Sequence, residues 1–324
     1  MPTYDNVRLM NMILNLYYIE RLKQSEIADR LHLSTAKVNR LIQQARNLGY
    51  IEFIIRAPFQ HLFELENRIK AVFNIQEAIV IPSVGDSLTS SLSAVGNAGA
   101  HFLLEHIRDG DVVAITPGTT VQAVMQSLDA TREYDVEIVP ILGSIQGELQ
   151  SDMNYLAVNM GDRLGAKSYQ LHAPVFVENR ESCEALKSME PVKKILDIGR
   201  NADVALLGVG TVDPKASRLV QYTALSIEEM NSIADDCGGV GEISAHVYNI
   251  DGHPCSEDYS GRIIGLTLDE IRNIPYRIGI ASSAAKSLPI YGALRGGYLH
   301  ALITDEAAAR GVLNLFDEKF RGIE

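Results

Sequence analysis

Apolar positions recur at two different spacings along the chain. Val7, Met10, Leu14 and Tyr17 fall at helical intervals, which predicts an amphipathic helix over residues 6–21. From residue 75 onward, short apolar runs alternate with helical patterns. The runs predict strands at 78–82, 111–116, 136–142, 168–172, 203–209, 278–281 and 299–304, and the helical patterns lie at 94–107, 119–128, 153–164, 190–200, 226–236, 284–295 and 305–316. This alternation predicts an α/β body with a mainly parallel sheet and helices on both faces.

A helix-turn-helix pattern follows the first helix. Ile27 and Leu31 share one helical face, and Ala28 is small where two helices would cross. His32 and Leu33 form the turn, at a position where glycine is usual and histidine is tolerated. The second helix is capped by Ser34, buries residues 38, 41 and 42, and ends at Gly49. The spacing predicts two helices locked at a steep angle.

The outward face of the second helix carries hydroxyl, amide and basic side chains. These are the groups that read base edges and contact phosphates in a major groove. The alternative is the solvated polar face of an ordinary helical bundle. The candidate DNA-binding residues are Ser34, Thr35, Lys37, Asn39, Arg40, Gln43 and Gln44.

Three segments divide the chain. Residues 1–57 form the helix-turn-helix domain and end in a short predicted strand at 50–56 before Pro58. Residues 58–74 form a linker helix with an apolar stripe at positions 62, 65, 69 and 72. This stripe predicts either pairing with a second copy of the chain or packing on the body. Residues 75–324 form a large effector domain.

Net charge is distributed unevenly between these segments. The 324 residues carry a formal net charge of −12, which alone argues against a nonspecific nucleic-acid-binding protein. Residues 1–57 carry +3, so the remaining residues carry −15, and no acidic residue lies between Leu33 and Ile51. This asymmetry favours a DNA-binding head on a body with another role.

Other classes of protein are disfavoured. No apolar run is long enough to span a bilayer, and no secretory signal is visible at the N-terminus. The three cysteines, Cys183, Cys237 and Cys255, are widely spaced, so we expect neither disulfides nor a metal site. A reducing cytoplasm and no cofactor are therefore expected.

Polar, glycine-bearing segments follow several predicted strands, where ligands bind on parallel sheets. Small residues and helix N-termini there suit sugar oxygens or a phosphate. The candidate effector-binding residues at these junctions are Gly118, Thr119, Thr120, Gly143, Ser144, Gly210, Thr211, Ser282, Ser283 and Lys286. Glu242 is a further candidate that could equally be structural, and Asp251-Gly252 is interpreted as a hairpin turn.

The chain resembles the SorC/DeoR-type sugar-responsive transcriptional regulators over nearly its whole length. The resemblance rests on Leu16-Tyr17-Tyr18, the helix-turn-helix over 24–41, Gly49-Tyr50, Asp109-Gly110-Asp111, Gly118-Thr119-Thr120, Gly208-Val209-Gly210-Thr211, Gly241-Glu242-Ile243, Gly265-Leu266-Thr267-Leu268, Lys286, 292–297 and 302–306. It implies a sugar-isomerase/deaminase-like body used for sensing, and homodimers or homotetramers. It also implies a sugar site that includes Thr119, Thr120, Gly210, Thr211, Glu242 and Lys286. Pro117 replaces a frequent tryptophan, and Ser282-Ser283 replaces the usual glycine pair.

Two functions are compatible with these features of the sequence. The first is a sequence-specific regulator of a carbohydrate-utilisation operon, controlled by a sugar, polyol or sugar phosphate. The alternative is a sugar-phosphate isomerase or deaminase that carries a DNA-binding head, with His172, His246 or His253 as acid–base candidates. No spacing pairs these histidines with carboxylates, so the regulator is favoured.

Overall fold

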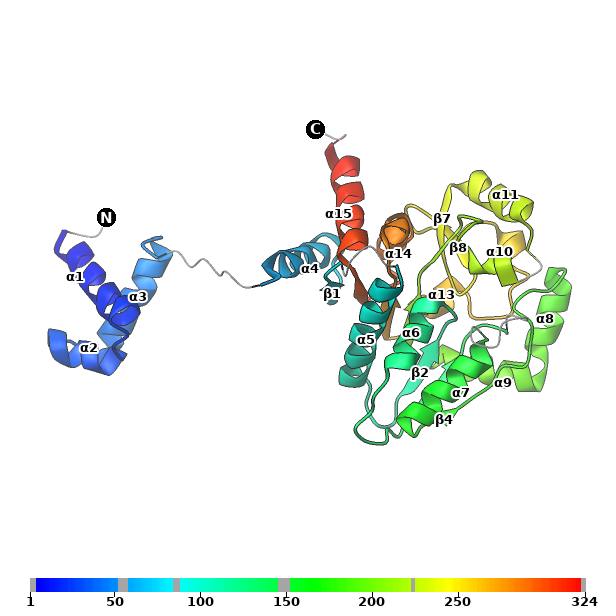
Figure 1. Cartoon of the computed structure of the whole chain (residues 1–324), viewed down its shortest axis with the longest axis horizontal. Helices are drawn as coiled ribbons and strands as arrows, with labels where there is room; N and C mark the ends of the chain where they lie inside the picture. Colours follow the sequence, from blue (N-terminus) through cyan, green and yellow to red (C-terminus); the bar gives the residue numbers. More distant parts are fainter. Residues whose placement is uncertain (1–3, 52–57, 84–87, 145–151, 223–224, 322–324) are drawn as a thin grey trace. The chain divides into compact units, whose positions relative to one another are not determined.

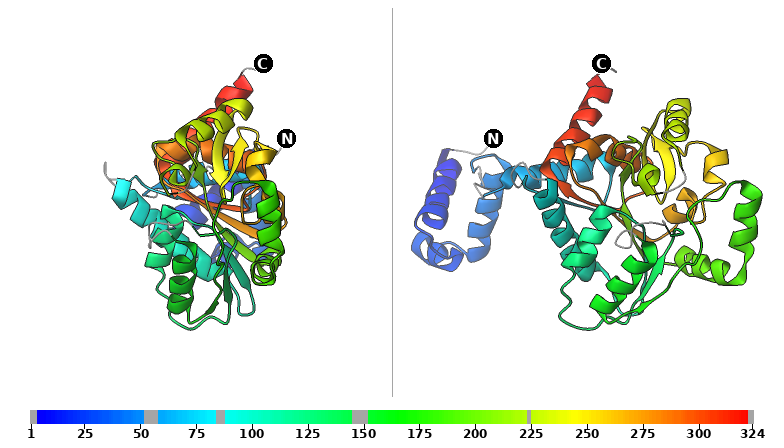
Figure 2. Two further views of the ribbon diagram at one scale, coloured as in Figure 1. Left: turned by 90° about the vertical axis from the view of Figure 1, so that its right-hand side faces the viewer. Right: turned by 45° about the vertical axis from the view of Figure 1, so that its right-hand side comes forward.

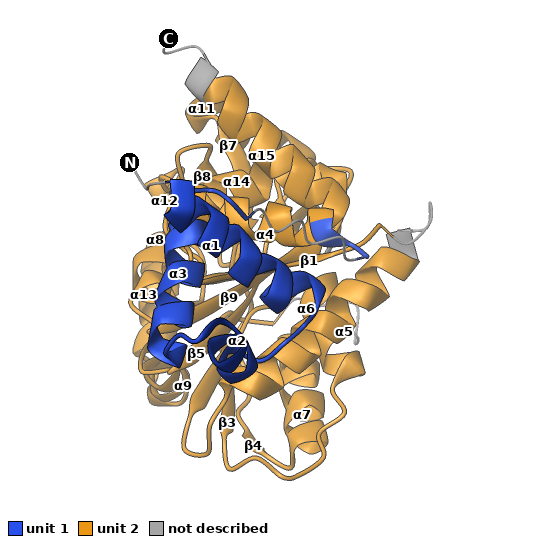
Figure 3. Ribbon diagram, turned by 90° about the vertical axis from the view of Figure 1, so that its left-hand side faces the viewer, with its two compact units in different colours: residues 1–60 blue, residues 61–324 orange. Residues whose placement is uncertain are grey.

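The computed structural model describes residues 4–51, 58–83, 88–144, 152–222 and 225–321. The chain divides into two compact units, residues 1–60 and 61–324 (Figures 1 and 3). The predicted strand at 50–56 falls largely outside the described residues. The linker helix α4 (Gln60–Phe73) belongs almost entirely to the second unit.

The first unit is a helix-turn-helix domain. The predicted first helix is α1 (Tyr4–Leu14), continued by a π-helical turn, η1 (Asn15–Ile19). The two helices of the motif are α2 (Gln24–Leu31) and α3 (Thr35–Asn47). Their buried side chains form one core cluster: Met10, Ile13, Leu16, Ile27, Ala28, Val38, Leu41, Ile42 and Ala45. The predicted buried faces of both helices are therefore confirmed.

The turn between α2 and α3 has the geometry that the sequence predicts. His32 adopts a left-handed conformation with φ of 54°. Ser34 caps α3 by accepting a hydrogen bond from the Lys37 main-chain N–H at 3.2 Å. Gly49, beyond the end of α3, has φ of +73°. Histidine thus fills a position that usually favours glycine.

A seven-stranded parallel sheet forms the centre of the second unit. The order of its strands is β1-β10-β9-β5-β2-β3-β4. Six of the seven predicted strands are present, as β1 (Glu77–Ile81), β2 (Val112–Ile115), β3 (Glu137–Pro140), β5 (Val204–Gly208), β9 (Tyr276–Ile280) and β10 (Ala301–Asp305). The strand predicted at 168–172 is reduced to β4 (Lys167–Ser168). Strands β2, β5 and β9 are neighbours, so the segments that follow them meet at one edge of the sheet.

Helices cover both faces of this sheet (Figures 1 and 2). One face packs against α5 (Leu88–His106), α6 (Thr119–Ser127) and α7 (Met153–Leu164). The other face packs against α4, α9 (Glu190–Arg200), α13 (Leu268–Arg272), α14 (Ser287–Arg295) and α15 (Glu306–Arg321). The structure confirms the predicted fold class, with two layers of helix around one sheet.

The apolar stripe of α4 packs on the body. Leu62 and Ile69 are buried in the same core cluster as α14 and α15, and Leu65 and Val72 pack against that cluster. The sequence left open whether this stripe pairs with a second copy of the chain or packs on the body. In the structure it packs on the body.

A small antiparallel lobe adjoins one end of the sheet. It contains β6 (Gly210–Thr211), β7 (Gly239–Ile243) and β8 (His246–Asn249), with α10 (Arg218–Tyr222), α11 (Ile227–Cys237) and α12 (Glu257–Ser260) around them. Its side chains form a separate core cluster. Of these elements, the sequence predicted only α11. Helix α8 (Arg180–Ser188), outside this lobe, was also not predicted. Asp251 and Gly252 form the turn expected of them, with a hydrogen bond from the Gly252 N–H to the Asn249 carbonyl.

A disulfide joins Cys237, at the end of α11, to Cys255. The expectation that all three cysteines stay unpaired is therefore wrong for this pair. The two residues are separated by 18 positions in sequence, but the lobe brings their Cα atoms to 5.7 Å. Cys183 is buried as a free thiol.

Candidate functional site

Helix α3 exposes the whole set of candidate DNA-binding side chains. Its buried residues, Val38, Leu41, Ile42 and Ala45, lie on the opposite side of the helix. The residues exposed to solvent include Ser34, Thr35, Lys37, Asn39, Arg40, Gln43 and Gln44. Ser34 is also the helix cap, so its hydroxyl already accepts a main-chain hydrogen bond.

The exposed face of α3 has a favourable charge for DNA. The helix contains no acidic residue, and Lys37 and Arg40 are both exposed. Arg46 lies further along α3 and donates hydrogen bonds to the Tyr18 hydroxyl. Lys37, Arg40 and the amides of Gln43 and Gln44 therefore form a surface suited to phosphates and base edges.

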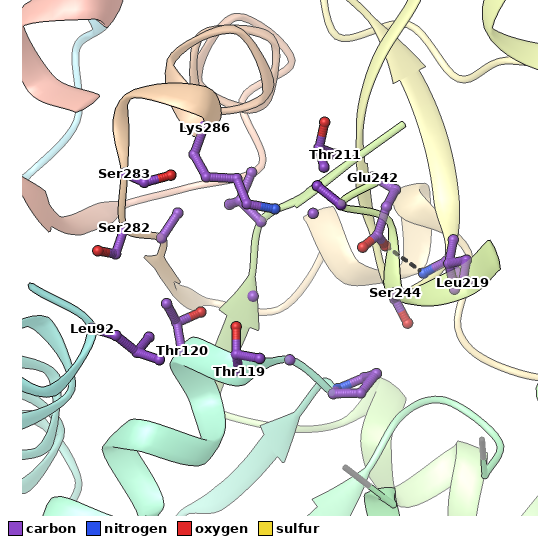
Figure 4. Close-up of a pocket in the computed structure, with 18 residues that line it drawn as sticks. Leu92, Thr119, Thr120, Thr211, Leu219, Glu242, Ser244, Ser282, Ser283 and Lys286 are labelled. Atoms are coloured by element: carbon purple, nitrogen blue, oxygen red, sulfur yellow. Dashed lines mark hydrogen bonds between the residues drawn. The ribbon is translucent and has the colours of Figure 1, made fainter. Parts of the chain in front are cut away.

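A cavity of about 230 Å³ lies beyond the carboxyl ends of β2, β5 and β9 (Figure 4). Parallel sheets bind ligands at this edge. Within the described part of the chain, its lining consists of Leu92, Pro117, Gly118, Thr119, Thr120, Gly208, Val209, Gly210, Thr211, Ala216, Leu219, Glu242, Ser244, Ala245, Ala281, Ser282, Ser283 and Lys286. The segments after three neighbouring strands and the β7–β8 hairpin thus contribute to one hollow.

All the candidate effector residues except two line this cavity. Gly143 and Ser144 do not, because they follow β3, one strand beyond β2. A Cβ on Gly143 would lie 2.3 Å from the Pro174 carbonyl oxygen, and the Ser144 hydroxyl accepts a hydrogen bond from Asn154 at 2.8 Å. Both residues are used in packing this part of the body.

Helix α6 begins at the cavity wall. Gly118 precedes it with φ of 141°, a conformation that favours glycine. Thr119 is exposed toward the cavity, whereas Thr120 is buried. The first N–H groups of a helix have no acceptor within the helix, so this end is suited to ligand oxygens.

Glu242 and Lys286 place opposite charges on the cavity lining (Figure 4). Burial raises the pKa of the Glu242 carboxyl, and this effect is opposed by Lys286 and by the Ala245 N–H. Burial lowers the pKa of Lys286, and this effect is opposed by Glu242. Each residue therefore favours the ionised form of the other in a site that is costly for isolated charge.

Close packing positions the Glu242 carboxylate. Its Oε2 accepts a hydrogen bond from the Ala245 main-chain N–H at 2.9 Å. Its Oε1 lies against Gly210, where an added Cβ would come within 1.6 Å. A larger residue at position 210 would therefore require the Glu242 carboxylate to move.

Asp305 organises the serine pair that precedes Lys286. The Ser282 hydroxyl donates a hydrogen bond to Asp305 Oδ2 at 2.8 Å, and the Ser283 main-chain N–H donates to the same oxygen. Ser283 has φ of 94°, a conformation that favours glycine. Asp305 itself is buried and leaves this loop fixed at the cavity wall.

Sequence reasoning did not include several lining residues as candidates. They are Leu92, Pro117, Gly208, Val209, Ala216, Leu219, Ser244, Ala245 and Ala281. Most are apolar or small and carry no chemical signal. Ser244 and Ala245 directly follow Gly241-Glu242-Ile243, so the motif itself indicated their position.

The three histidines considered for acid–base chemistry lie outside the lining of this cavity. His246 is buried and hydrogen-bonds to the Leu266 carbonyl at 3.1 Å. Its pKa is lowered to about 4 by burial. Among the described residues, no group of His, Cys, Asp and Glu is placed to hold a metal ion. The described helices include none long and apolar enough to cross a membrane.

Comparisons with known proteins match both units. Residues 57–314 match the family described as "Putative sugar-binding domain", and residues 10–48 match region 4 of sigma-70 factors. The erythritol catabolism regulatory protein EryD of Brucella abortus is 28% identical over 300 residues, which cover 92% of this chain and 94% of that protein.

The sorbitol operon regulator of Klebsiella pneumoniae is 28% identical over 316 residues, which cover 97% of this chain and 100% of that protein. The crystal structure of full-length SorC from the same organism aligns with a TM-score of 0.73 at 26% identity, covering 95% of this chain and 99% of that one. This chain belongs to the SorC/DeoR-type family of sugar-responsive transcriptional regulators.

Proposed function

We propose that this chain regulates a carbohydrate-utilisation operon. In this proposal α3 binds operator DNA, and the cavity beyond β2, β5 and β9 binds a sugar, polyol or sugar phosphate. The observation that carries the effector site is the cavity lining itself. It combines Glu242 and Lys286 with the hydroxyls of Thr119 and Thr211 at the ligand-binding edge of a parallel sheet.

The effector acts by shifting the equilibrium between two conformations of the regulator. A ligand changes DNA affinity only as far as it binds the two conformations with different affinity. The acting species is a cytoplasmic homodimer or homotetramer, since several linked heads reach an affinity for a specific site that one head lacks. The relatives named after erythritol and sorbitol support a polyhydroxylated effector.

The chain binds its effector without converting it. The position of the three histidines outside the cavity lining supports this part of the proposal. Incubation with sugar phosphates should give no isomerised or deaminated product, although a bound probe raises the melting temperature. Turnover of any of these compounds would favour the enzyme alternative.

Lys286 provides the test of the effector site. The probes are erythritol, sorbitol, D-ribose, 2-deoxy-D-ribose and their monophosphates, screened by thermal shift. Operator binding is measured by fluorescence anisotropy on a duplex selected from a random-sequence library. The Lys286→Ala variant should bind this duplex like the wild type but no longer respond to the probe.

Lys193→Ala is the matched control, because Lys193 is exposed on α9 and does not line the cavity. It should respond to the probe like the wild type. A Lys286→Ala variant that responds fully would contradict the assigned site. A loss of response confined to phosphorylated probes would identify the effector as a sugar phosphate.

A further inference from the structure

The disulfide between Cys237 and Cys255 closes a loop around the β7–β8 hairpin. Cys237 ends α11, just before β7 begins at Gly239, and Cys255 lies beyond Asn249, the last residue of β8. The closed loop therefore contains both strands of the hairpin and the turn between them. The Cys255 main-chain N–H also donates a hydrogen bond of 2.8 Å to the Val247 carbonyl, which joins this cysteine directly to β8.

The turn of this hairpin reaches the effector cavity. Glu242, Ser244 and Ala245 line the cavity, and all three lie inside the loop that the disulfide closes. Cys255 and Ala245 are buried in one core cluster together with Leu219 of α10, which also lines the cavity. The disulfide and this side of the cavity therefore belong to one packed lobe.

The disulfide constrains the base of the hairpin, where strand pairing is irregular. The register of the β7–β8 ladder shifts between Gly239 and Gly241, so regular pairing runs only from Gly241 toward the turn. Helix α11 packs on both strands (Figure 1), and the disulfide fixes its end to the segment that follows β8. Opening the bond removes this constraint, so the lobe should open locally more often.

The surroundings of the two cysteines suit a bond that opens and closes. Cys237 is only partly buried, so a small thiol can reach it, whereas Cys255 is 2% exposed. The Cys237 sulfur lies 3.1 Å from the Ile233 carbonyl oxygen, so its thiol has an acceptor within α11 after reduction. In the cytoplasm proposed above, small thiols keep most cysteines reduced, and the disulfides that form are usually transient.

We propose that Cys237 and Cys255 form a thiol–disulfide switch that sets the affinity of the cavity for its effector. In the oxidised form the hairpin is cross-linked at its base, and the effector binds more tightly. In the reduced form the hairpin is freer, and the effector binds more weakly because its site is less well ordered beforehand. This inference rests on the proposed function, because it concerns the regulation of the same site.

The oxidant of this switch is a low-molecular-weight disulfide. The Cys237 thiolate attacks one sulfur of the small disulfide, a mixed disulfide forms, and one small thiolate leaves. The Cys255 thiolate then attacks the Cys237 sulfur, the protein disulfide forms, and the second small thiolate leaves. Two protein thiols thereby lose two electrons to the small disulfide, and their two protons pass to the two small thiols released. The reverse sequence reduces the switch.

Calorimetric titration of protein equilibrated with glutathione tests the switch. The probe is the compound of the thermal-shift panel that the wild type binds most tightly. The ratio of glutathione disulfide to glutathione is varied, and thiol titration follows the state of the Cys237–Cys255 bond. Reduction of this bond should raise the Kd for the probe roughly 3- to 10-fold, because the hairpin must then be ordered on binding.

Cysteine variants identify the bond that is responsible. Cys237→Ser should bind the probe like the reduced wild type at every glutathione ratio, since it cannot form the bond. Its melting temperature should equal that of the reduced wild type, which shows that the variant folds. Cys183→Ala is the matched control, because Cys183 is a free, buried thiol that does not line the cavity. This control should keep the full redox response.

Three results would overturn the proposal. They are equal probe affinity in the oxidised and reduced wild type, a bond that no glutathione ratio opens or closes, and a redox response of the affinity that persists in Cys237→Ser. Wild-type protein that binds no probe in either form would instead contradict the proposed function itself.

Discussion

The hydroxyl of Thr120, near the start of α6, donates a hydrogen bond of 3.1 Å to the main-chain carbonyl of Ile280, the last residue of β9. This bond joins the start of α6 to the end of β9, next to the two segments that line the cavity on those sides. Thr120 and Thr119 are therefore adjacent residues with different roles. The first holds the cavity together, and the second is exposed toward its interior.

Valine substitutions should separate these two roles. Thr120→Val should lower the free energy of unfolding by about 1 kcal/mol, because one intramolecular hydrogen bond is lost. Thr119→Val should leave stability within about 0.5 kcal/mol of wild type but weaken effector binding roughly 3- to 10-fold. Urea denaturation and calorimetric titration measure the two effects. Unchanged affinity in Thr119→Val would remove Thr119 from the site.

Operator binding should depend on the exposed middle of α3. A double variant, Arg40→Ala with Gln43→Ala, should fold normally because both residues are exposed. It should bind the selected operator duplex at least about tenfold more weakly, as expected when base contacts are removed. Arg8→Ala, on the exposed surface of α1, removes one positive charge elsewhere and should have a much smaller effect. A similar loss of operator affinity in the double variant and in Arg8→Ala would indicate a general effect of charge.

The buried His246 should make folding stability depend on pH. Its pKa of about 4 lies below the usual histidine value of 6.5, so between these values the unfolded chain binds a proton that the folded chain does not. The contribution of neutral His246 to the free energy of unfolding is complete above about pH 6.5 and is lost as the pH falls toward 4. Between pH 7.5 and pH 5 this loss amounts to about 2 kcal/mol. His246→Gln should reduce the pH dependence of the unfolding free energy by about this amount. An unchanged pH dependence would show that His246 is not buried in the neutral form.

The disulfide between Cys237 and Cys255 should stabilise the small lobe. It closes a loop with a sequence separation of 18 residues, for which loop entropy predicts about 3 kcal/mol. Reductant should therefore lower the melting temperature of the wild type but not that of Cys237→Ser. Thiol titration of the denatured protein should find one free thiol before reduction and three after it. Three thiols before reduction would show that the bond does not form.

The parallel sheet could be predicted from the sequence because its strands are nearly continuous apolar runs buried on both faces. Even so, the run at 168–172 gives only the two-residue edge strand β4. The antiparallel lobe was missed for a different reason. Gly239 and Gly241 interrupt any alternation in β7, and the Ser244-Ala245 turn lacks the usual Asn-Gly signal of a hairpin.

The candidate site, like the fold, could be predicted from the sequence only in part. Residues that follow β2, β5 and β9 were predicted as effector-binding candidates because ligands bind beyond the carboxyl ends of parallel strands. The strand order, which the structure supplies, brings these three segments together at one cavity. Gly143 and Ser144 satisfied the same rule but follow β3, and sequence alone does not give the order of strands in the sheet. The pairing of Cys237 with Cys255 depends on the same long-range arrangement.

The contact between Gly210 and Glu242 has a consequence for sequence variation. Any side chain at position 210 would collide with the carboxylate, so this position can change only when position 242 shortens or turns away. The two positions should therefore vary together among related regulators. A relative with alanine or a larger residue at the first position is expected to have a shorter residue at the second, or a carboxylate that is turned away from it. To engineer a new effector specificity, the two codons should be randomised jointly.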